Sequence, residues 1–166
     1  CPFLCNFCAS HSTHGRSMRY HSVERVVGDA LKLRDDYGVN TILFEDDLVF
    51  ANKKQFSEIV VKLADNGFKM DFSSGVSVAH LNDTSISAIK YAKVTQIKLA
   101  VETGSERVLK DVIRKPYHKL TMVQEAVNRL RKADIFIRGF WIIGLPRESL
   151  DEIFASLDFF RETGFN

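Results

Sequence analysis

Four short apolar segments with the composition of β-strands recur along the chain, each followed by a segment with helical periodicity. They cover residues 39–44, 68–73, 94–101 and 135–143. Val, Ile and Phe are frequent in them, and such β-branched and aromatic side chains favour strands. The strands start roughly 26 to 41 residues apart, which is the spacing of βαβ units. We therefore expect an α/β protein with a parallel sheet, arranged as a partial barrel or as an open doubly wound sheet.

Apolar residues at helical spacing predict six helices around these strands. The helices are expected over residues 23–37, 53–66, 83–93, 106–114, 122–132 and 150–163. Thr121 with Gln124, and Ser149 with Glu152, form capping boxes ahead of the last two helices. Residues 9–21, ahead of the first helix, are polar and are expected to form a loop.

Composition places the chain among water-soluble globular proteins. It has 45% hydrophobic and 27% charged residues, and its 166 residues suffice for one domain with a sizeable core. The net charge of +2 gives no strong basis for binding nucleic acid or an anionic membrane, and no apolar run approaches the ~20 residues of a membrane helix. We expect a cytoplasmic protein. The chain starts at Cys1 without an initiator methionine, so residues 1–166 are expected to be one domain cut from a longer protein.

All three cysteines lie within the first eight residues, with the spacing C-x3-C-x2-C. An odd number cannot form a closed set of disulfides, and such clustering in a reducing compartment indicates a metal. Three thiolates at Cys1, Cys5 and Cys8 suit an iron–sulfur cubane in which three irons have protein ligands and one stays open. The rival interpretation is a zinc site on Cys5, Cys8, His11 and His14. Its short gaps leave little chain between the ligand pairs, and Cys1 has no role in it.

The turns that follow the predicted strands carry a second group of candidate residues. Asp46 and Asp47 follow the first strand, Ser74 the second, Glu102 the third and Gly144 the fourth. The carboxyl ends of parallel strands meet at one edge of a sheet or barrel, and ligands bind there in such folds. Turn chemistry alone also favours Gly, Ser and Asp at these positions. Together with the cysteine loop, the four turns favour a ligand site at that edge.

Several segments, in order, resemble one enzyme family. The cysteine loop, with Phe7 ahead of its last cysteine, is similar to the signature of radical S-adenosylmethionine (radical SAM) enzymes. Residues 102–105 (ETGS) resemble the family's fourth-strand segment, and residues 114–116 (RKP) match the basic stretch that often follows it. Residues 140–148 (FWIIGLPRE) are similar to its fifth-strand F-x-I-x-G-x-P-G-E segment. The pattern from residue 99 to residue 148 most resembles subfamilies that carry a cobalamin-binding domain before the barrel.

The resemblance implies a partial (β/α)6 TIM-like barrel whose first strand and last β/α unit lie outside this segment. It implies a [4Fe–4S] cluster and S-adenosylmethionine as cofactors and, in such subfamilies, cobalamin bound by a domain outside the chain. Reductive cleavage of S-adenosylmethionine would give methionine and a 5′-deoxyadenosyl radical that abstracts hydrogen from an unidentified small-molecule or macromolecular substrate. The implied reaction is methyl transfer or ring formation, with a methylthiotransferase or tRNA-modifying enzyme as the alternative. The implied partner is an electron donor such as flavodoxin or ferredoxin.

The resemblance also assigns roles to individual residues. Cys1, Cys5 and Cys8 match the three iron ligands. The intact cysteines and Glu102 argue against a degenerate relative that serves only as a binding module. The residues expected to contact S-adenosylmethionine are Phe7, Asp46, Asp47, Ser74, Glu102, Ile143 and Gly144.

Each expected contact follows the matching position in the family. Phe7 would lie near the adenine, and Ser74 would meet the ribose or the methionine carboxylate. Glu102 would accept hydrogen bonds from the ribose hydroxyls. Ile143 and Gly144 would offer backbone groups to the adenine, with glycine allowing a close approach.

Three positions depart from the family pattern or have two interpretations. The Gly-Gly-Glu that usually follows the family's second strand, which corresponds to the first predicted strand here, is replaced by residues 45–47 (EDD). The carboxylate that meets the methionine ammonium is therefore left open among Glu45, Asp46 and Asp47. Asp46 and Asp47 could also simply start a loop or cap a helix. Arg147 stands where many relatives have glycine. Arg138 would contact a carboxylate or the substrate if it points into the barrel, or would form a salt bridge.

Overall fold

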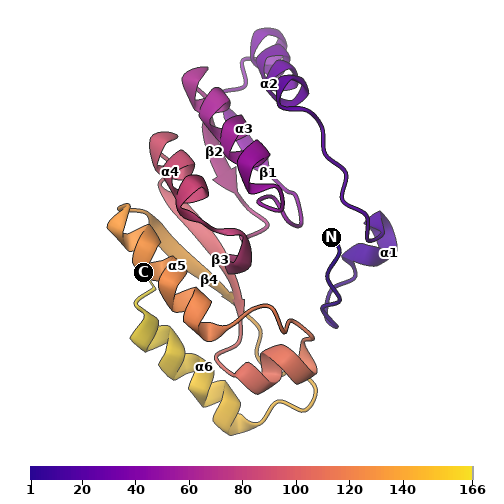
Figure 1. The fold of residues 1–166 in the computed structure, drawn as a ribbon, viewed down its shortest axis with the longest axis vertical. Coiled ribbons are helices and arrows are strands. Elements are labelled where there is room, and N and C mark those ends of the chain that lie inside the picture. The colour runs from indigo at the N-terminus through magenta and orange to yellow at the C-terminus, as the bar shows by residue number, and fades with distance from the viewer. Residues whose placement is uncertain (166) are drawn as a thin grey trace.

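The computed structural model describes residues 1–165, and its four strands are all parallel to their neighbours. They are β1 (Thr41–Phe44), β2 (Lys69–Phe72), β3 (Gln96–Glu102) and β4 (Phe136–Trp141). β1 pairs with β2 and β3 pairs with β4, and a parallel bridge between Val76 and Leu99 connects the two pairs. The predicted α/β class with parallel strands is confirmed. The strands of the described chain form no closed barrel (Figure 1).

Six α-helices accompany the strands. They are α1 (Ser10–His14), α2 (Val23–Tyr37), α3 (Lys53–Asp65), α4 (Asp83–Tyr91), α5 (Leu120–Lys132) and α6 (Leu150–Thr163). A 3-10 turn, η1 (Val78–His80), and a π-helical segment, η2 (Val108–Val112), lie between them. All six predicted helices occur, the fourth of them around η2, whereas α1 forms where a loop was predicted. No helix among the described residues has both the length and the apolar character that crossing a membrane requires.

The start of α5 differs from the prediction. The capping box of Thr121 and Gln124 is wrong, because α5 begins at Leu120 and Lys119 occupies the N-cap without a side-chain hydrogen bond. The N–H of Leu120 instead donates to the Glu106 carboxylate at 2.8 Å. A carboxylate from another segment therefore accepts a hydrogen bond from a backbone N–H at this helix start. The predicted capping box of α6 is confirmed.

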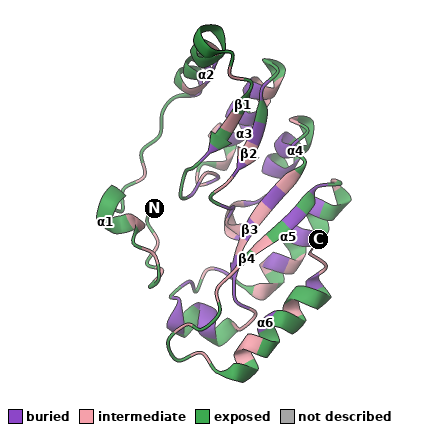
Figure 2. Ribbon diagram, turned by 180° about the vertical axis from the view of Figure 1, so that it is seen from behind, coloured by how far each residue is buried: buried purple, intermediate pink, exposed green. Residues whose placement is uncertain are grey.

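The helices between the strands pack on one face of the sheet. The strands follow one another in chain order, and right-handed crossovers that all step in the same direction place their helices on the same side. In β3 the side chains of Ile97, Leu99 and Val101 are fully buried on that side, whereas Lys98 and Ala100 point the other way. Figure 1 shows α3, α4 and α5 in front of the strands, and Figure 2 shows the strands from behind. One face of the sheet thus forms the core and the other stays open.

Four phenylalanines hold the loop that follows β1. Phe50 is 1% exposed and contacts the rings of Phe56 and Phe72 at centroid distances of 4.5 Å and 5.6 Å. Phe44, the last residue of β1, stacks on Phe72 at 5.4 Å. Such aromatic pairs contribute about 0.5–1.5 kcal/mol beyond the area that they bury. Both ends of the acidic loop 45–49 are therefore anchored in the core.

The segment after β3 packs directly against α6. The hydroxyls of Thr103 and Ser156 lie 3.1 Å apart, and the Gly104 N–H donates to Ser156 Oγ at 2.8 Å. Ser105 Oγ donates to Glu152 Oε1 at 2.9 Å. A Cβ on Gly104 would lie 2.6 Å from the Ser156 Cα. The Thr-Gly-Ser part of the ETGS motif therefore holds α6 against the sheet.

The close approach at Gly104 gives the first prediction. Gly104→Ala is expected to lower the free energy of unfolding by about 1–3 kcal/mol, because the added Cβ forces the α6 backbone to move. Gly28→Ala is the matched control: it lies within α2 and its Cβ would meet nothing within 4 Å. The control should raise the free energy of unfolding by about 0.5–1 kcal/mol. Urea denaturation measures both, and equal effects of the two substitutions would contradict the packing role.

Candidate functional site

The cysteine loop is attached to the end of η2. The Asn6 N–H donates to the Ile113 carbonyl at 2.9 Å, and its side-chain amide donates to the Val112 carbonyl at 2.8 Å. Cys5 packs against the small apolar cluster around η2. These contacts use carbonyls at the end of η2 as anchors for the loop.

The three cysteines are free and half-buried, but they do not converge on one point. Cys1 lines a cavity beside the loop after β1. Cys5 Sγ lies 3.8 Å from the hydroxyl of Tyr117, and the Cys8 N–H donates to the Cys5 carbonyl at 3.2 Å. Among the described residues, no three Cys, His, Asp or Glu side chains are grouped as metal ligands. The donor set fits a thiolate-bound cluster in its chemistry, and the loop must close to bring the thiolates together.

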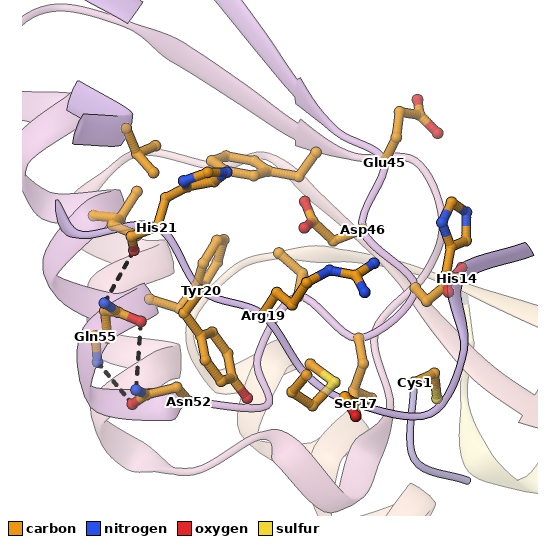
Figure 3. Close-up of a pocket in the computed structure, with 18 residues that line it drawn as sticks. Cys1, His14, Ser17, Arg19, Tyr20, His21, Glu45, Asp46, Asn52 and Gln55 are labelled. Atoms are coloured by element: carbon orange, nitrogen blue, oxygen red, sulfur yellow. Dashed lines mark hydrogen bonds between the residues drawn. The ribbon is translucent and has the colours of Figure 1, made fainter. Parts of the chain in front are cut away.

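A cavity of about 560 Å³ lies between residues 14–21 and the loop after β1 (Figure 3). Its lining includes Cys1, Asp46 and Asp47, so one predicted iron ligand and both predicted aspartates share a site. Figure 3 shows the Arg19 side chain extending into this cavity near Asp46. The cavity therefore presents both signs of charge, as a zwitterionic ligand requires.

Ser74 lies beside Glu45 at the carboxyl end of β2. Ser74 Oγ donates to Glu45 Oε2 at 3.3 Å, and the hydroxyl of the neighbouring Ser73 donates to Glu45 Oε1. Glu45 also lines the 560 Å³ cavity. These bonds connect the predicted Ser74 position with the acidic loop.

The three acids of residues 45–47 have different partners. Glu45 accepts from serine hydroxyls, as described, and Asp47 accepts from the hydroxyl of Ser10 in α1. Asp46 is the one acid of this loop without a side-chain hydrogen bond among the described residues. Neither aspartate caps α3, because Asn52 occupies that N-cap and accepts from the Gln55 N–H. The helix-cap alternative for Asp46 and Asp47 is therefore wrong.

Glu102 lies at a bulge at the end of β3 and forms a buried ion pair. Its φ of 73° is left-handed, which is uncommon for residues other than glycine. Lys115 Nζ lies 2.8 Å from Glu102 Oε1, and the two side chains are 6% and 9% exposed respectively. The Glu102 carbonyl accepts from the Ile142 N–H at 2.8 Å, which connects the bulge to the chain after β4. Lys115 was not predicted as a site residue, although the basic stretch 114–116 was the signal that contained it.

Tyr117 connects the ion pair region with the cysteine loop. Its ring stacks on Phe3 at a centroid distance of 4.0 Å, and its hydroxyl lies near Cys5 Sγ. Burial, followed by the nearby Cys5, raises the pKa of Tyr117 above its ordinary value. The phenol therefore stays protonated and can donate to the sulfur. Sequence reasoning missed Tyr117 because this contact joins residues far apart in the chain.

His118 is fully buried, and neither of its ring nitrogens has a hydrogen-bond partner in the described chain. Burial, and secondly the positive charge of Lys115, lower the pKa of His118 to about 3. The imidazole is therefore neutral at physiological pH. Its burial next to a charged residue was not visible in the sequence.

Phe7 and the turn after β4 line a second cavity, of about 190 Å³. Asn6, Ile113 and Leu145 contribute to the same lining. The predicted adenine-side aromatic residue and the Gly-Leu-Pro turn are thus brought together, although the two segments lie at opposite ends of the chain.

The Glu148 carboxylate closes the turn after β4. The N–H groups of Gly144 and Leu145 donate to Glu148 Oε2 at 2.7 Å and 3.0 Å. Ile143, the residue before this turn, is exposed. Arg147, where many relatives have glycine, adopts a φ of 69°, a conformation that glycine adopts without strain.

Comparison with known proteins identifies the family. A model described as the radical SAM superfamily matches residues 1–160. The chain belongs to the radical SAM superfamily. The matched span contains the cysteine loop, Glu102 and the turn after β4, so the predicted family is confirmed and the chain belongs to a superfamily of enzymes.

Three relatives illustrate the range of reactions in this part of the radical SAM superfamily. The chain is 28% identical to cytidylyl-2-hydroxyethylphosphonate methyltransferase of Streptomyces wedmorensis, covering 100% of the chain and 32% of that protein. It is 28% identical to anaerobic magnesium-protoporphyrin IX monomethyl ester cyclase of Cereibacter sphaeroides, over 92% and 25%. It is 25% identical to tRNA-2-methylthio-N(6)-dimethylallyladenosine synthase of Rickettsia bellii, over 99% and 39%. The chain thus spans about a third of the length of these radical SAM relatives.

The buried ion pair of this radical SAM chain gives the second prediction. Lys115→Met should lower the free energy of unfolding by about 3–5 kcal/mol, because it leaves the Glu102 carboxylate buried without a counter-charge. The double variant Lys115→Met/Glu102→Leu should recover most of that loss, since no buried charge remains. Urea denaturation at neutral pH measures both. Additive losses in the double variant would show that the two side chains do not depend on each other.

His118 gives the third prediction. As pH falls from about 6 to about 4, unfolded His118 binds a proton, whereas folded His118, with a pKa of about 3, does not. Protonation then favours the unfolded chain, so His118 should cost about 1.4 kcal/mol of unfolding free energy per pH unit in this range. His118→Leu should remove this contribution. The difference between the urea unfolding free energies of the two proteins at several pH values is the measurement, and a constant difference would contradict the buried neutral imidazole.

Proposed function

We propose that this chain is the part of a radical SAM enzyme that binds a [4Fe–4S] cluster through Cys1, Cys5 and Cys8 and S-adenosylmethionine at the adjoining strand ends. The observation that carries the proposal is a loop with three free, half-buried thiols that borders both cavities: Cys1 lines the larger one, and Asn6 and Phe7 line the smaller one. Bound there, the cluster and S-adenosylmethionine would supply a 5′-deoxyadenosyl radical for hydrogen abstraction. The family membership supports the same assignment.

The loop's own contacts suit this role. Asn6 ties the loop to η2 through two hydrogen bonds, which anchor the part of the loop that lies between Cys5 and Cys8. Tyr117 offers a protonated hydroxyl to Cys5, and hydrogen bonds to sulfur adjust the potential of iron–sulfur clusters. Metal coordination would provide free energy for closing the loop.

The 560 Å³ cavity would take the amino-acid end of S-adenosylmethionine. Asp46 lines it and has no side-chain hydrogen bond among the described residues, so it is our choice for the ammonium group among the three acids of this loop. Glu45 and Asp47 are engaged with serines and would position the loop. Ser74, bonded to Glu45, would meet the ribose or the carboxylate.

The nucleoside end would lie between the cysteine loop and the turn after β4. Phe7 lines the 190 Å³ cavity there and would pack on the adenine, and Ile143 and Gly144 would offer backbone groups to it. Lys115 occupies Oε1 of Glu102, which leaves the second oxygen for a ribose hydroxyl. Lys115 would thus position Glu102.

We propose methyl transfer or ring formation as the reaction, with cobalamin bound by another domain of the full-length enzyme. Both reaction types occur among the relatives named above. A methylthiotransferase-like activity is the alternative that the tRNA-methylthiolating relative supports. Electrons would come from a donor such as flavodoxin or ferredoxin, and we place the enzyme in the cytoplasm.

Cluster reconstitution gives the fourth prediction. After anaerobic reconstitution with iron and sulfide, the protein should absorb near ~400 nm as thiolate-bound [4Fe–4S] clusters do. On reduction with dithionite it should convert S-adenosylmethionine to methionine and 5′-deoxyadenosine, detected by chromatography. Cys5→Ala should abolish both signals, because the cluster loses one of its three ligands.

The matched control separates the cluster from the zinc interpretation. His11 and His14 lie exposed on α1, and the double variant His11→Ala/His14→Ala should keep its iron and its absorption. A zinc site on Cys5, Cys8, His11 and His14 would instead lose metal in this variant. Stoichiometric zinc with no iron in the parent protein would overturn the proposed function.

A further inference from the structure

The open face of the sheet carries a row of side chains that none of the described helices covers. Parallel sheets normally have both faces covered, yet Leu43, Phe136 and Phe140 are 57%, 44% and 43% exposed on this face. These side chains alternate with buried or partly buried neighbours along their strands, so they all point away from the helices. An apolar surface of this kind, interrupted by charges, is typical of a ligand-binding face.

The charges on this face are unbalanced. In the strand register Lys98 lies beside Arg138, and Lys98 Nζ pairs with Asp71 at 3.2 Å. Lys69 lies on the same face, two residues before Asp71. Three cations therefore face one acid within the strands. An anion would balance the excess, and Arg138 is the cation best placed to bind it.

Arg138 has no ion pair among the described residues. Its guanidinium lies 5.8 Å from the centroid of the Phe136 ring, and the side chain is exposed. A guanidinium that is stacked on an aromatic ring keeps its hydrogen-bond donors directed outward, where they can bind a carboxylate or a phosphoryl group through two parallel bonds. The salt bridge expected as the alternative role of Arg138 is not formed within this part of the chain.

The two aromatic rings beside Arg138 provide a flat apolar surface. Phe136 and Phe140 precede and follow Arg138 by two residues, so all three share one face of β4. A Cβ on Gly75 would lie 2.9 Å from the Phe140 ring, so glycine makes room for this ring against the end of β2. Planar apolar ligands stack well on such rings.

The distance to the proposed cofactor site sets the size of the ligand. The N–H of Ile142 bonds to the Glu102 carbonyl, and Ile142 lies four positions after Arg138, which corresponds to about 13 Å of extended chain. A small acid held at Arg138 would not reach the strand ends. A planar ligand on the order of 13 Å long, its anionic group included, would do so.

We propose that this open face binds a substrate that carries an oxyanion on a planar apolar ring system, with Arg138 as the residue that selects for the anion. The proposal rests on the proposed function, because that function places the reacting cofactor at the carboxyl ends of the same strands. Phe140 and Phe136 hold the ring system, and Arg138 holds the carboxylate or phosphoryl group at the end away from the cofactor.

The test uses three fluorescent probes of one shape: pyrene-1-carboxylate, pyrene-1-phosphonate and the neutral pyrene-1-methanol. Fluorescence anisotropy is measured on the whole chain without iron or S-adenosylmethionine. At least one anion should bind about tenfold more tightly than the alcohol. Arg138→Gln should reduce this preference to about twofold or less, and Arg138→Lys should restore part of it. Arg161→Gln, on α6 and paired with Asp158, is the matched control and should keep the full preference.

A preference that survives in Arg138→Gln, or an alcohol that binds the parent protein as tightly as both anions, would overturn the proposal. Phe140→Ala should weaken binding of all three probes about fivefold or more, and unchanged binding would show that they lie elsewhere on the protein. Whichever anion binds more tightly identifies the group as carboxylate or phosphoryl. Because the assay contains no cofactor, a failed cluster reconstitution overturns the proposed function and leaves this binding result to be judged separately.

Discussion

The ion pair between Glu102 and Lys115 joins the two parts on which the candidate site depends. Glu102 ends β3 and is bonded to the chain after β4, whereas Lys115 follows η2, which anchors the cysteine loop through Asn6. Both charges are buried, and a buried charge without its partner is costly. The ion pair therefore connects the strand ends with the segment that anchors the cysteine loop, and Tyr117 extends this connection to Cys5.

The second constraint is the uniform sense of the strand crossovers. It places the helices between the strands on one face, so the other face of each strand is free to carry charged and aromatic side chains. The Thr103–Gly104 contact with Ser156 adds α6 to the helical layer. The chain thereby separates its two tasks: one face holds the fold together, and the open face and the strand ends are available for ligands.

Much of this architecture was predictable from the sequence. Strand and helix periodicity predicted the four strands of the described chain and the six expected helices, and the predicted strand ends contained Asp46, Ser74 and Glu102. The start of α5 was mispredicted because the Glu106 carboxylate from another segment satisfies it. Tyr117 and His118 were missed because their significance comes from burial and from partners distant in the chain, which no local pattern records.

The sequence by itself determined the order of the elements, the family and the spacing of the cysteines, because these depend only on neighbouring residues along the chain. Only the tertiary structure decided which side chains are engaged in hydrogen bonds or packing and which remain available to a ligand. In it, Glu45 and Asp47 accept hydrogen bonds from serines, whereas Asp46 has no such partner among the described residues. Gly104 of the ETGS motif allows α6 to pack closely. It also set Arg138 on the uncovered face, because strand register and helix placement are properties of contacts between distant segments.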